Sequence, residues 1–188
     1  MVEVRLAEKY FLDSLDYASD NPWVYESLAA LDLTRMRAST IPRDALAYTR
    51  GAHARFRQAL RQRPTSPFLW ANLALTKLYL DEIDDELLTA LRHADELGPH
   101  EPTVQQTALF VGLAAWQELG SDRRQALRQS VERGALRNSQ KMFEIVKSYG
   151  RLDLVCAIKK YEALAGPDCR KAAAAARSGE GIRQGIGQ

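Results

Sequence analysis

Apolar side chains recur at steps of three and four residues along most of the chain, and this is the period of one face of an α-helix. Turn-forming and polar residues interrupt the pattern, so the sequence predicts consecutive amphipathic helices joined by short connections. The best-defined helices are expected over 3–19, 22–36, 43–63, 66–80 and 83–97. The fold class predicted is all-α, with about eight to nine helices.

Two short patterns return along the chain and indicate an internal repeat. The first consists of small or large apolar residues followed by a proline, and it occurs as Ala52, Phe56, Ala59, Pro64 and, 35 residues later, as Leu87, Leu91, Ala94, Pro99. The second begins a helix, and it occurs as Pro22, Tyr25, Leu28, Ala29 and as Pro67, Trp70, Leu73, Ala74. The repeats are therefore best defined over 22–64 and 67–99, and 3–19 corresponds to the second helix of a preceding unit.

The first full repeat is longer than the second, because 42 residues separate Pro22 from Pro64. The range 37–42 contains Ser39 and Thr40 before a proline, which is typical of a loop. We therefore expect the extra residues to form a loop insertion there.

After Pro102 the repeat becomes irregular. A strongly apolar helix is expected to end near Gly120, and Ser121 or Asp122 is expected to cap a helix that runs to Gly134. Two further apolar runs, ended by Gly150 and Gly166, predict a short helical hairpin. Degenerate terminal units of this kind are expected to cover the open end of a stack of repeats.

The domain is expected to span 1–166, followed by a tail over 167–188. The alanine run 172–176 favours a marginal helix within 168–178, although large apolar residues are almost absent from it. The four glycines of 179–188 predict disorder.

The period and the W-x2-L and A-x3-F landmarks resemble the tetratricopeptide (TPR) repeat, a helical hairpin of 34 residues. This resemblance implies a right-handed superhelix of antiparallel helix pairs, whose first helices line a concave groove. The repeat positions that face the groove in this family correspond here to Trp23, Ser27, Phe68, Asn72, Leu75, Tyr79, Thr103, Gln106 and Phe110. Such a groove is apolar and lined with side-chain amides.

The same resemblance argues against one known use of the groove. Some members clamp the carboxylate at a partner's C-terminus with lysine, arginine and asparagine side chains. Only Asn72 occupies a clamp position here, whereas Glu26 and Ala30 replace the first-repeat residues and Thr103 and Thr107 replace the cations of the third. An amphipathic helix or an extended peptide with aromatic anchors is the expected partner.

Charge gives little reason to expect nucleic acid as a partner. Lysine and arginine number 26 against 24 acidic residues, which leaves a formal net charge of +2. The arginines within 50–63 are expected to form the solvated face of their helix. The acidic residues of 81–86 are expected to complement the positive end of a helix dipole rather than to bind a cation.

Catalytic chemistry is not indicated. His53, His93 and His100 are scattered, and the chain has no glycine-rich phosphate loop, H-E-x-x-H or G-x-S-x-G motif. We therefore expect no enzyme activity, no cofactor and no metal. The alternative to partner binding is a structural or self-associating subunit, such as a homodimer, whose groove is filled by its own residues.

Cys156 and Cys169 leave two readings open. They are either two reduced cysteines buried as small apolar residues or a disulfide, and the latter implies an oxidising compartment. No apolar run approaches the roughly 18 residues of a membrane span, so direct membrane insertion is not expected. The chain is expected in the cytoplasm if it is complete, and at the periplasmic face of the inner membrane if an upstream anchor has been removed.

One further resemblance bears on this choice. The segment Gly150 to Cys156, the second cysteine beside Arg170, and the preceding TPR-like units are similar to the soluble domain of membrane-anchored TPR proteins of bacterial exopolysaccharide biosynthesis and export. The resemblance implies an envelope location, a Cys156–Cys169 disulfide, and a role in assembling secretion components.

Overall fold

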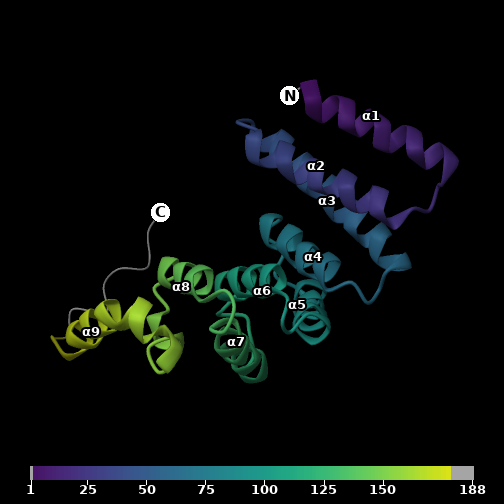
Figure 1. The fold of residues 1–188 in the computed structure, drawn as a ribbon. Helices are drawn as coiled ribbons and strands as arrows, with labels where there is room; N and C mark the ends of the chain where they lie inside the picture. The colour runs from purple at the N-terminus through teal and green to yellow at the C-terminus, as the bar shows by residue number, and fades with distance from the viewer. Residues whose placement is uncertain (1, 179–188) are drawn as a thin grey trace.

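The structure is a computed structural model that describes residues 2–178, with side chains from residue 5 to residue 174. Within this range the chain is all-α, as predicted, and contains nine α-helices (Figure 1). The helices are α1 (Val2–Tyr17), α2 (Pro22–Ala38), α3 (Pro42–Gln62), α4 (Pro67–Tyr79), α5 (Asp85–Leu97), α6 (Pro102–Ala114), α7 (Ser121–Gly134), α8 (Ser139–Ser148) and α9 (Glu162–Ser178). The disorder expected over 179–188 lies outside the described residues.

Local signals start the central helices where the sequence places them. A proline occupies the first turn of α2, α3, α4 and α6, where its missing N–H costs nothing. The side chain of Asn21 accepts a hydrogen bond from the backbone N–H of Trp23, and Ser66 accepts one from Leu69. Asp84 accepts bonds from the N–H groups of residues 86 and 87 at the start of α5.

The helices pack in order along the chain. α2 pairs with α3, α4 with α5, and α6 with α7, while α4 also contacts α6 and α6 contacts α8. In the view of Figure 1, α4, α6 and α8 therefore follow one another in one layer, and α5 and α7 lie below it. α1 packs on α2.

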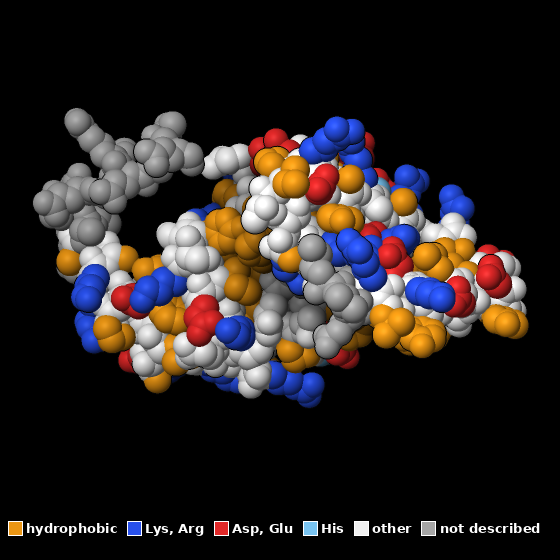
Figure 2. Space-filling view, turned by 90° about the horizontal axis from the view of Figure 1, so that it is seen from above, with side chains coloured by type: hydrophobic (Ala, Val, Ile, Leu, Met, Phe, Trp, Pro, Cys, Tyr) orange, Lys and Arg blue, Asp and Glu red, His pale blue; other side chains and the backbone are white. Residues whose placement is uncertain are grey.

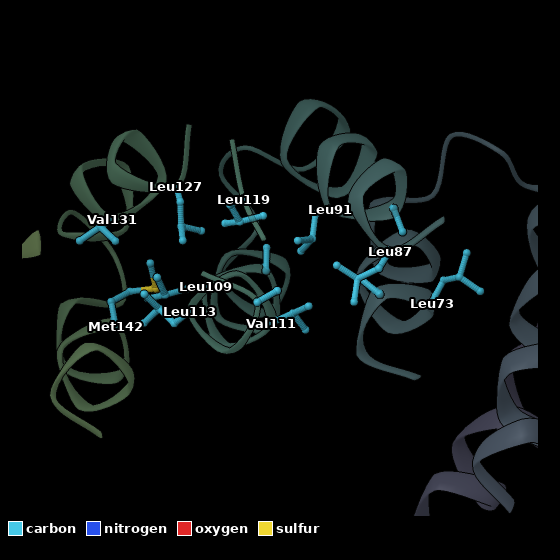
Figure 3. Packing of buried hydrophobic residues seen from close by; sticks show 14 of the residues in the cluster. Leu73, Leu87, Leu91, Leu109, Val111, Leu113, Leu119, Leu127, Val131 and Met142 are labelled. Atoms are coloured by element: carbon cyan, nitrogen blue, oxygen red, sulfur yellow. The ribbon is translucent and has the colours of Figure 1, made fainter. Parts of the chain in front are cut away.

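One apolar core extends through these layers. It begins with Ala29 on α2, passes through Phe56 on α3 and Leu109 on α6, and reaches Ala165 on α9. Figure 3 shows its central part, where Leu91, Leu119 and Leu127 lie on one side of α6. The described hairpins are thus joined by continuous burial of apolar surface.

The expected insertion over 37–42 is wrong. Only residues 39–41 connect α2 to α3, because Arg37 and Ala38 continue α2 and Pro42 begins α3. The extra length is helical: α2 has 17 residues and α3 has 21, against 13 each in α4 and α5. Arginine and alanine both favour a helix, so nothing in 37–38 ends α2 early.

Two expected helix ends near residue 120 are also wrong. α6 ends at Ala114 rather than near Gly120, and residues 115–118 form turns. The residue that precedes α7 is Gly120, and no side chain caps this helix. The Ser121 hydroxyl donates instead to the Asp122 carboxylate at 3.1 Å, so neither side chain serves as the expected cap.

The second helix of the predicted C-terminal hairpin is wrong as well. Residues 152–161 form two short 3₁₀ helices, η1 (Leu152–Leu154) and η2 (Lys159–Tyr161), rather than one apolar helix ended by Gly166. α9 then passes through Gly166 and Pro167, so the proposed boundary between domain and tail falls inside a helix. The helix expected within 168–178 is present as the second part of α9.

None of the helices in the described part of the chain combines the length and the apolar character that crossing a bilayer requires.

Candidate functional site

The nine residues expected to line a groove are distributed over three helices. Trp23 and Ser27 lie on α2, four lie on α4, and three lie on α6. None of the nine is buried, and the exposed ones include Trp23, Phe68 and Tyr79. Trp23 is 62% exposed, and Phe68 and Tyr79 are each 39% exposed.

The aromatic residues of α4 and α6 continue onto α8. The ring of Phe110 meets the ring of Tyr149 edge-on, with 5.8 Å between their centroids. Burial, with a smaller contribution from nearby Tyr79, raises the pKa of Tyr149 above its ordinary value. Tyr79 of α4, Phe110 of α6 and Tyr149, which directly follows α8, therefore lie close together in one layer, and we call them the aromatic face.

Hydrophobic side chains also gather on the upper side of the molecule. Figure 2 looks down on the upper side of Figure 1 and shows hydrophobic side chains gathered in a depression between the two ends of the molecule. The repeat register predicts Tyr79 and Phe110 as groove residues but does not identify Tyr149 as their neighbour. Tyr149 directly follows α8, and its contact with Phe110 depends on how α8 packs on α6, which the local sequence does not show.

Side-chain amides accompany the rings. Asn72 on α4 and Gln106 on α6 are half-buried, and neither forms a side-chain hydrogen bond with another described residue. The neighbouring Gln105 behaves differently, because it is buried and donates to the Pro99 carbonyl at 2.7 Å. Asn72 and Gln106 thus retain donors and acceptors for another molecule.

Trp23 has a different neighbour. The guanidinium of Arg63 lies over its ring, 3.5 Å from the centroid, and donates to the Glu26 carboxylate at 2.7 Å. Arg63 follows α3, so this contact ties the start of α2 to the end of α3. The expectation that the arginines of 50–63 are simply solvated is therefore wrong for Arg63, which is half-buried between two helices.

Arg55 departs from the same expectation. It is half-buried, donates to the carboxylate of buried Asp32, and links α3 to α2. Arg35 lies 3.9 Å from Asp32 and forms two hydrogen bonds with Glu8 of α1, at 2.7 and 2.5 Å. These ion pairs connect the first three helices, and burial raises the pKa of Asp32 despite the two arginines.

The acidic residues after α4 surround a lysine. Lys77 is buried, and its ammonium pairs with Glu82, with Asp84 at 2.6 Å, and with Glu86 at 3.8 Å. Burial acts to lower the pKa of Lys77, but its hydrogen bonds to the carboxylates outweigh this and raise it. The cluster was expected to complement a helix dipole, and Asp84 does cap α5, but sequence reasoning missed the lysine at its centre.

The histidines lie in separate environments. His53 Nδ1 is 3.2 Å from the Thr76 hydroxyl and its Nε2 is 3.5 Å from Glu86, and burial lowers its pKa. His93 stacks against Trp70 with 4.6 Å between ring centroids, and His100 is exposed. In the part of the chain that the structure describes, no group of histidine, cysteine, aspartate and glutamate side chains is arranged to hold a metal ion.

A pocket lies where α6 faces α5 and α7. The pocket has a volume of about 410 Å³ and opens between α5 and α7. Its apolar residues include Leu91, Ala108, Gly112, Leu119 and Leu127, and Arg92, Asp95, Glu96 and Arg123 lie around it. The charges are mostly engaged: Arg92 pairs with Glu96 at 3.1 Å and Asp95 pairs with Arg133 at 2.6 Å. Sequence reasoning did not locate this pocket.

Cys156 and Cys169 are joined by a disulfide, with 5.6 Å between their Cα atoms. The bond ties the turn after η1 to α9, and Lys147 of α8 pairs with Asp168 at 2.8 Å. Beside it, Tyr161 is fully buried, donates to the Val131 carbonyl at 3.2 Å, and has its pKa raised by burial to about 12. These contacts hold the C-terminal elements on α7 and α8.

No protein-family model, curated protein or solved structure matches this chain.

Proposed function

We propose that this chain is a non-enzymatic scaffold that binds another protein, which lays a helix or an extended peptide along α4, α6 and α8. The observation that supports it most directly is the aromatic face, whose three rings are exposed or half-buried and lie on α4, on α6 and at the end of α8. The unpaired amides of Asn72 and Gln106 lie on the same two helices, α4 and α6. Rings supply the apolar anchors of peptide recognition, and amides can bond the partner's backbone.

The proposed architecture is a right-handed, TPR-like superhelix built from the hairpins α2–α3, α4–α5 and α6–α7. The order of packing supports it, because α4 contacts α6 and α6 contacts α8, as expected when the first helices of successive repeats form one wall. The C-terminal elements would then serve as the cap of the stack.

The proposed setting is a bacterial envelope complex for polysaccharide synthesis or secretion, which rests on the sequence resemblance. The disulfide favours an oxidising compartment, because thiols in the cytosol are kept reduced. Thiol titration of the denatured protein, prepared from its source cells without reductant, tests this. Two reactive thiols would argue for a cytoplasmic protein and against the envelope setting.

Site-specific photo-crosslinking in source cells tests the binding face. A photoreactive phenylalanine analogue is placed at Phe68, Tyr79 or Thr103 in separate variants, and at exposed Glu132 on α7 as the matched control. We expect one adduct of constant mass from the first three positions and none from position 132. Adducts only from position 132, or none from any position, would contradict the proposed face.

A double substitution then separates binding from folding. Asn72→Ala with Tyr79→Ala removes one amide and one ring, and neither side chain is buried. We expect capture of the crosslinked partner to fall at least tenfold while Tm stays within about 3 °C. If capture is unchanged, the aromatic face is not the binding site; a self-filled groove would instead leave these side chains protected in a dimer.

A further inference from the structure

The N-terminal helix is covered on one side only. α5 packs against both α4 and α6, whereas α1 makes its main contacts with α2. The residues that α1 turns toward α2 are half-buried, namely Ala7, Glu8, Phe11, Ser14 and Leu15. Its other side carries large apolar residues that nothing in the described chain covers.

Three of these residues form a stripe. Leu6, Tyr10 and Tyr17 are 53%, 66% and 94% exposed, and they are separated by four and seven residues. Steps of four and seven return to the same side of an α-helix, so the three side chains line up along α1. Leu12 is also exposed, at 45%, but its position places it away from this stripe.

The exposed charges of α1 are divided along the helix, and Lys9 and Asp13 are the two that flank the stripe. Arg5 and Lys9 lie in the N-terminal half and Asp13 and Asp16 lie in the C-terminal half, and all four are exposed. None of them forms an ion pair with a described residue, whereas Glu8 on the α2-facing side of α1 pairs with Arg35. Carboxylates near the end of a helix oppose its dipole, so this order does not stabilise α1 by itself.

We propose that α1 binds α1 of a second copy of this chain in an antiparallel, two-fold symmetric pair. In this arrangement Leu6 of one copy lies against Tyr17 of the other, and the two Tyr10 side chains lie near the centre. Lys9 of each copy then lies near Asp13 of the other along one edge of the contact, whereas Arg5 and Asp16 project on the side of Leu12. The unfavourable order of charges along one helix becomes complementary between two.

The contact is small. One pair of helices with 16 residues each falls below the size of most stable interfaces, so we expect reversible dimers with a Kd on the order of 10 to 100 µM. The surface is separate from the aromatic face of α4, α6 and α8, so this proposal does not depend on the proposed function. A dimer through α1 leaves that face open in both copies.

Sedimentation velocity across a concentration series tests the dimer and the stripe. We expect the average mass to rise from monomer toward dimer as the concentration passes through roughly 10 to 100 µM. Tyr10→Ser is expected to weaken dimerisation at least tenfold, whereas Leu12→Ser, the matched control on the same helix, leaves it unchanged. A chain that stays monomeric at several hundred micromolar, or equal effects of both variants, would overturn the proposal.

Charge reversal tests the direction of the pair. Lys9→Glu makes the flank of the stripe acidic, and Asp13→Lys makes it basic. Each variant alone should be monomeric, and an equimolar mixture should restore a heterodimer of twice the monomer mass. Both variants place charges that suit the helix dipole better than the natural ones do, so a loss of dimerisation is not expected to come from unfolding of α1. Homodimers of either variant alone, or a mixture that stays monomeric, would rule out antiparallel pairing.

Discussion

The hairpins α2–α3 and α4–α5 each bury one charged side chain, and the two side chains differ in the number and position of their ion-pair partners. Asp32 of α2 and Lys77 of α4 are both 4% exposed. Asp32 has a close partner in Arg55 and a more distant one in Arg35. Lys77 is surrounded by three carboxylates. The two residues therefore show how the number and geometry of partners decide whether a buried charge is favoured.

The pKa directions express the difference. Burial raises the pKa of Asp32, and the attraction of Arg55 does not offset it, so folding disfavours the ionised form of this carboxyl. The pKa of Lys77 is raised although burial acts to lower it, so folding favours the ionised form of this amine. Burial thus disfavours the charged form of both residues, and only the partners of Lys77 outweigh it.

Backbone geometry determines which groups lie close to Asp32 and to Lys77. Gly51 lets α3 approach Asp32 closely, because a Cβ at this position would lie 2.7 Å from an oxygen of the Asp32 carboxylate. Lys77 instead reaches the start of α5, where Asp84 already accepts two backbone hydrogen bonds. One charge is enclosed by an approaching helix, and the other meets carboxylates fixed at a helix start.

Removing the partner of Asp32 should have the largest effect. Arg55→Ala leaves a buried carboxylate without its nearest cation, and we expect a loss of about 3 kcal/mol in the free energy of unfolding. Urea unfolding at neutral pH measures it. Arg57→Ala on the same helix is the control: its side chain is exposed and 3.3 Å from Glu86, so it should cost less than about 0.5 kcal/mol. Equal losses of stability in Arg55→Ala and Arg57→Ala would contradict the claim that the buried ion pair contributes more than the exposed one.

Lys77→Met should cost less, about 1 kcal/mol. The carboxylates left behind are half-exposed or partly exposed, so they regain water, and methionine fills much of the same space. The same variant should return the pKa of Asp84 toward its ordinary value of 3.8, because the lysine helps to lower it. NMR titration of the carboxyl measures this, and an unchanged Asp84 pKa would show that Lys77 does not act on it.

The pH dependence of stability should differ in sign between the two hairpins. The contribution of Asp32 is present below its unfolded pKa near 3.8 and is lost as pH rises through its raised folded pKa. The contribution of Asp84 is present above 3.8 and is lost as pH falls through its lowered folded pKa. Relative to Asp32→Asn, the natural chain should therefore lose stability as pH rises from acid, and relative to Asp84→Asn it should gain. If the two stability differences changed with pH in the same direction, the opposite pKa shifts of Asp32 and Asp84 would be contradicted.

The smallest effect is expected from Asp32→Asn at neutral pH. Asparagine has nearly the same shape and can accept a hydrogen bond from Arg55, while the charge that folding disfavours is gone. We expect the free energy of unfolding to change by less than about 1 kcal/mol in either direction. A loss as large as that of Arg55→Ala would show that the ionised carboxylate is strongly stabilising, against the present interpretation.

The sequence predicted elements whose signals are local. The starts of α2 and α4 follow from Pro22 and Pro67, each placed one residue after a capping side chain. Tyr79 and Phe110 were placed on one face by the repeat register, and both lie in the aromatic face. The groove residues as a binding surface stay a prediction.

Other features depend on contacts between distant segments. Asp32 and Lys77 each interrupt a helix pattern at one position, and nothing local shows that Arg55, 23 residues away, lies beside Asp32. The path of α9 through Pro167 contradicts the turn signal of its sequence, and the disulfide and the Lys147–Asp168 pair hold it against η1 and α8. Tertiary contacts override local preference at such places.

The bond between Cys156 and Cys169 gives α9 a second covalent connection to the molecule. A protease that cuts the backbone between the two cysteines does not release the C-terminal fragment, since the sulfurs still hold it in place. Release needs both the cut and a reductant. Nicked protein would therefore migrate as one band on a non-reducing gel and as two after reduction.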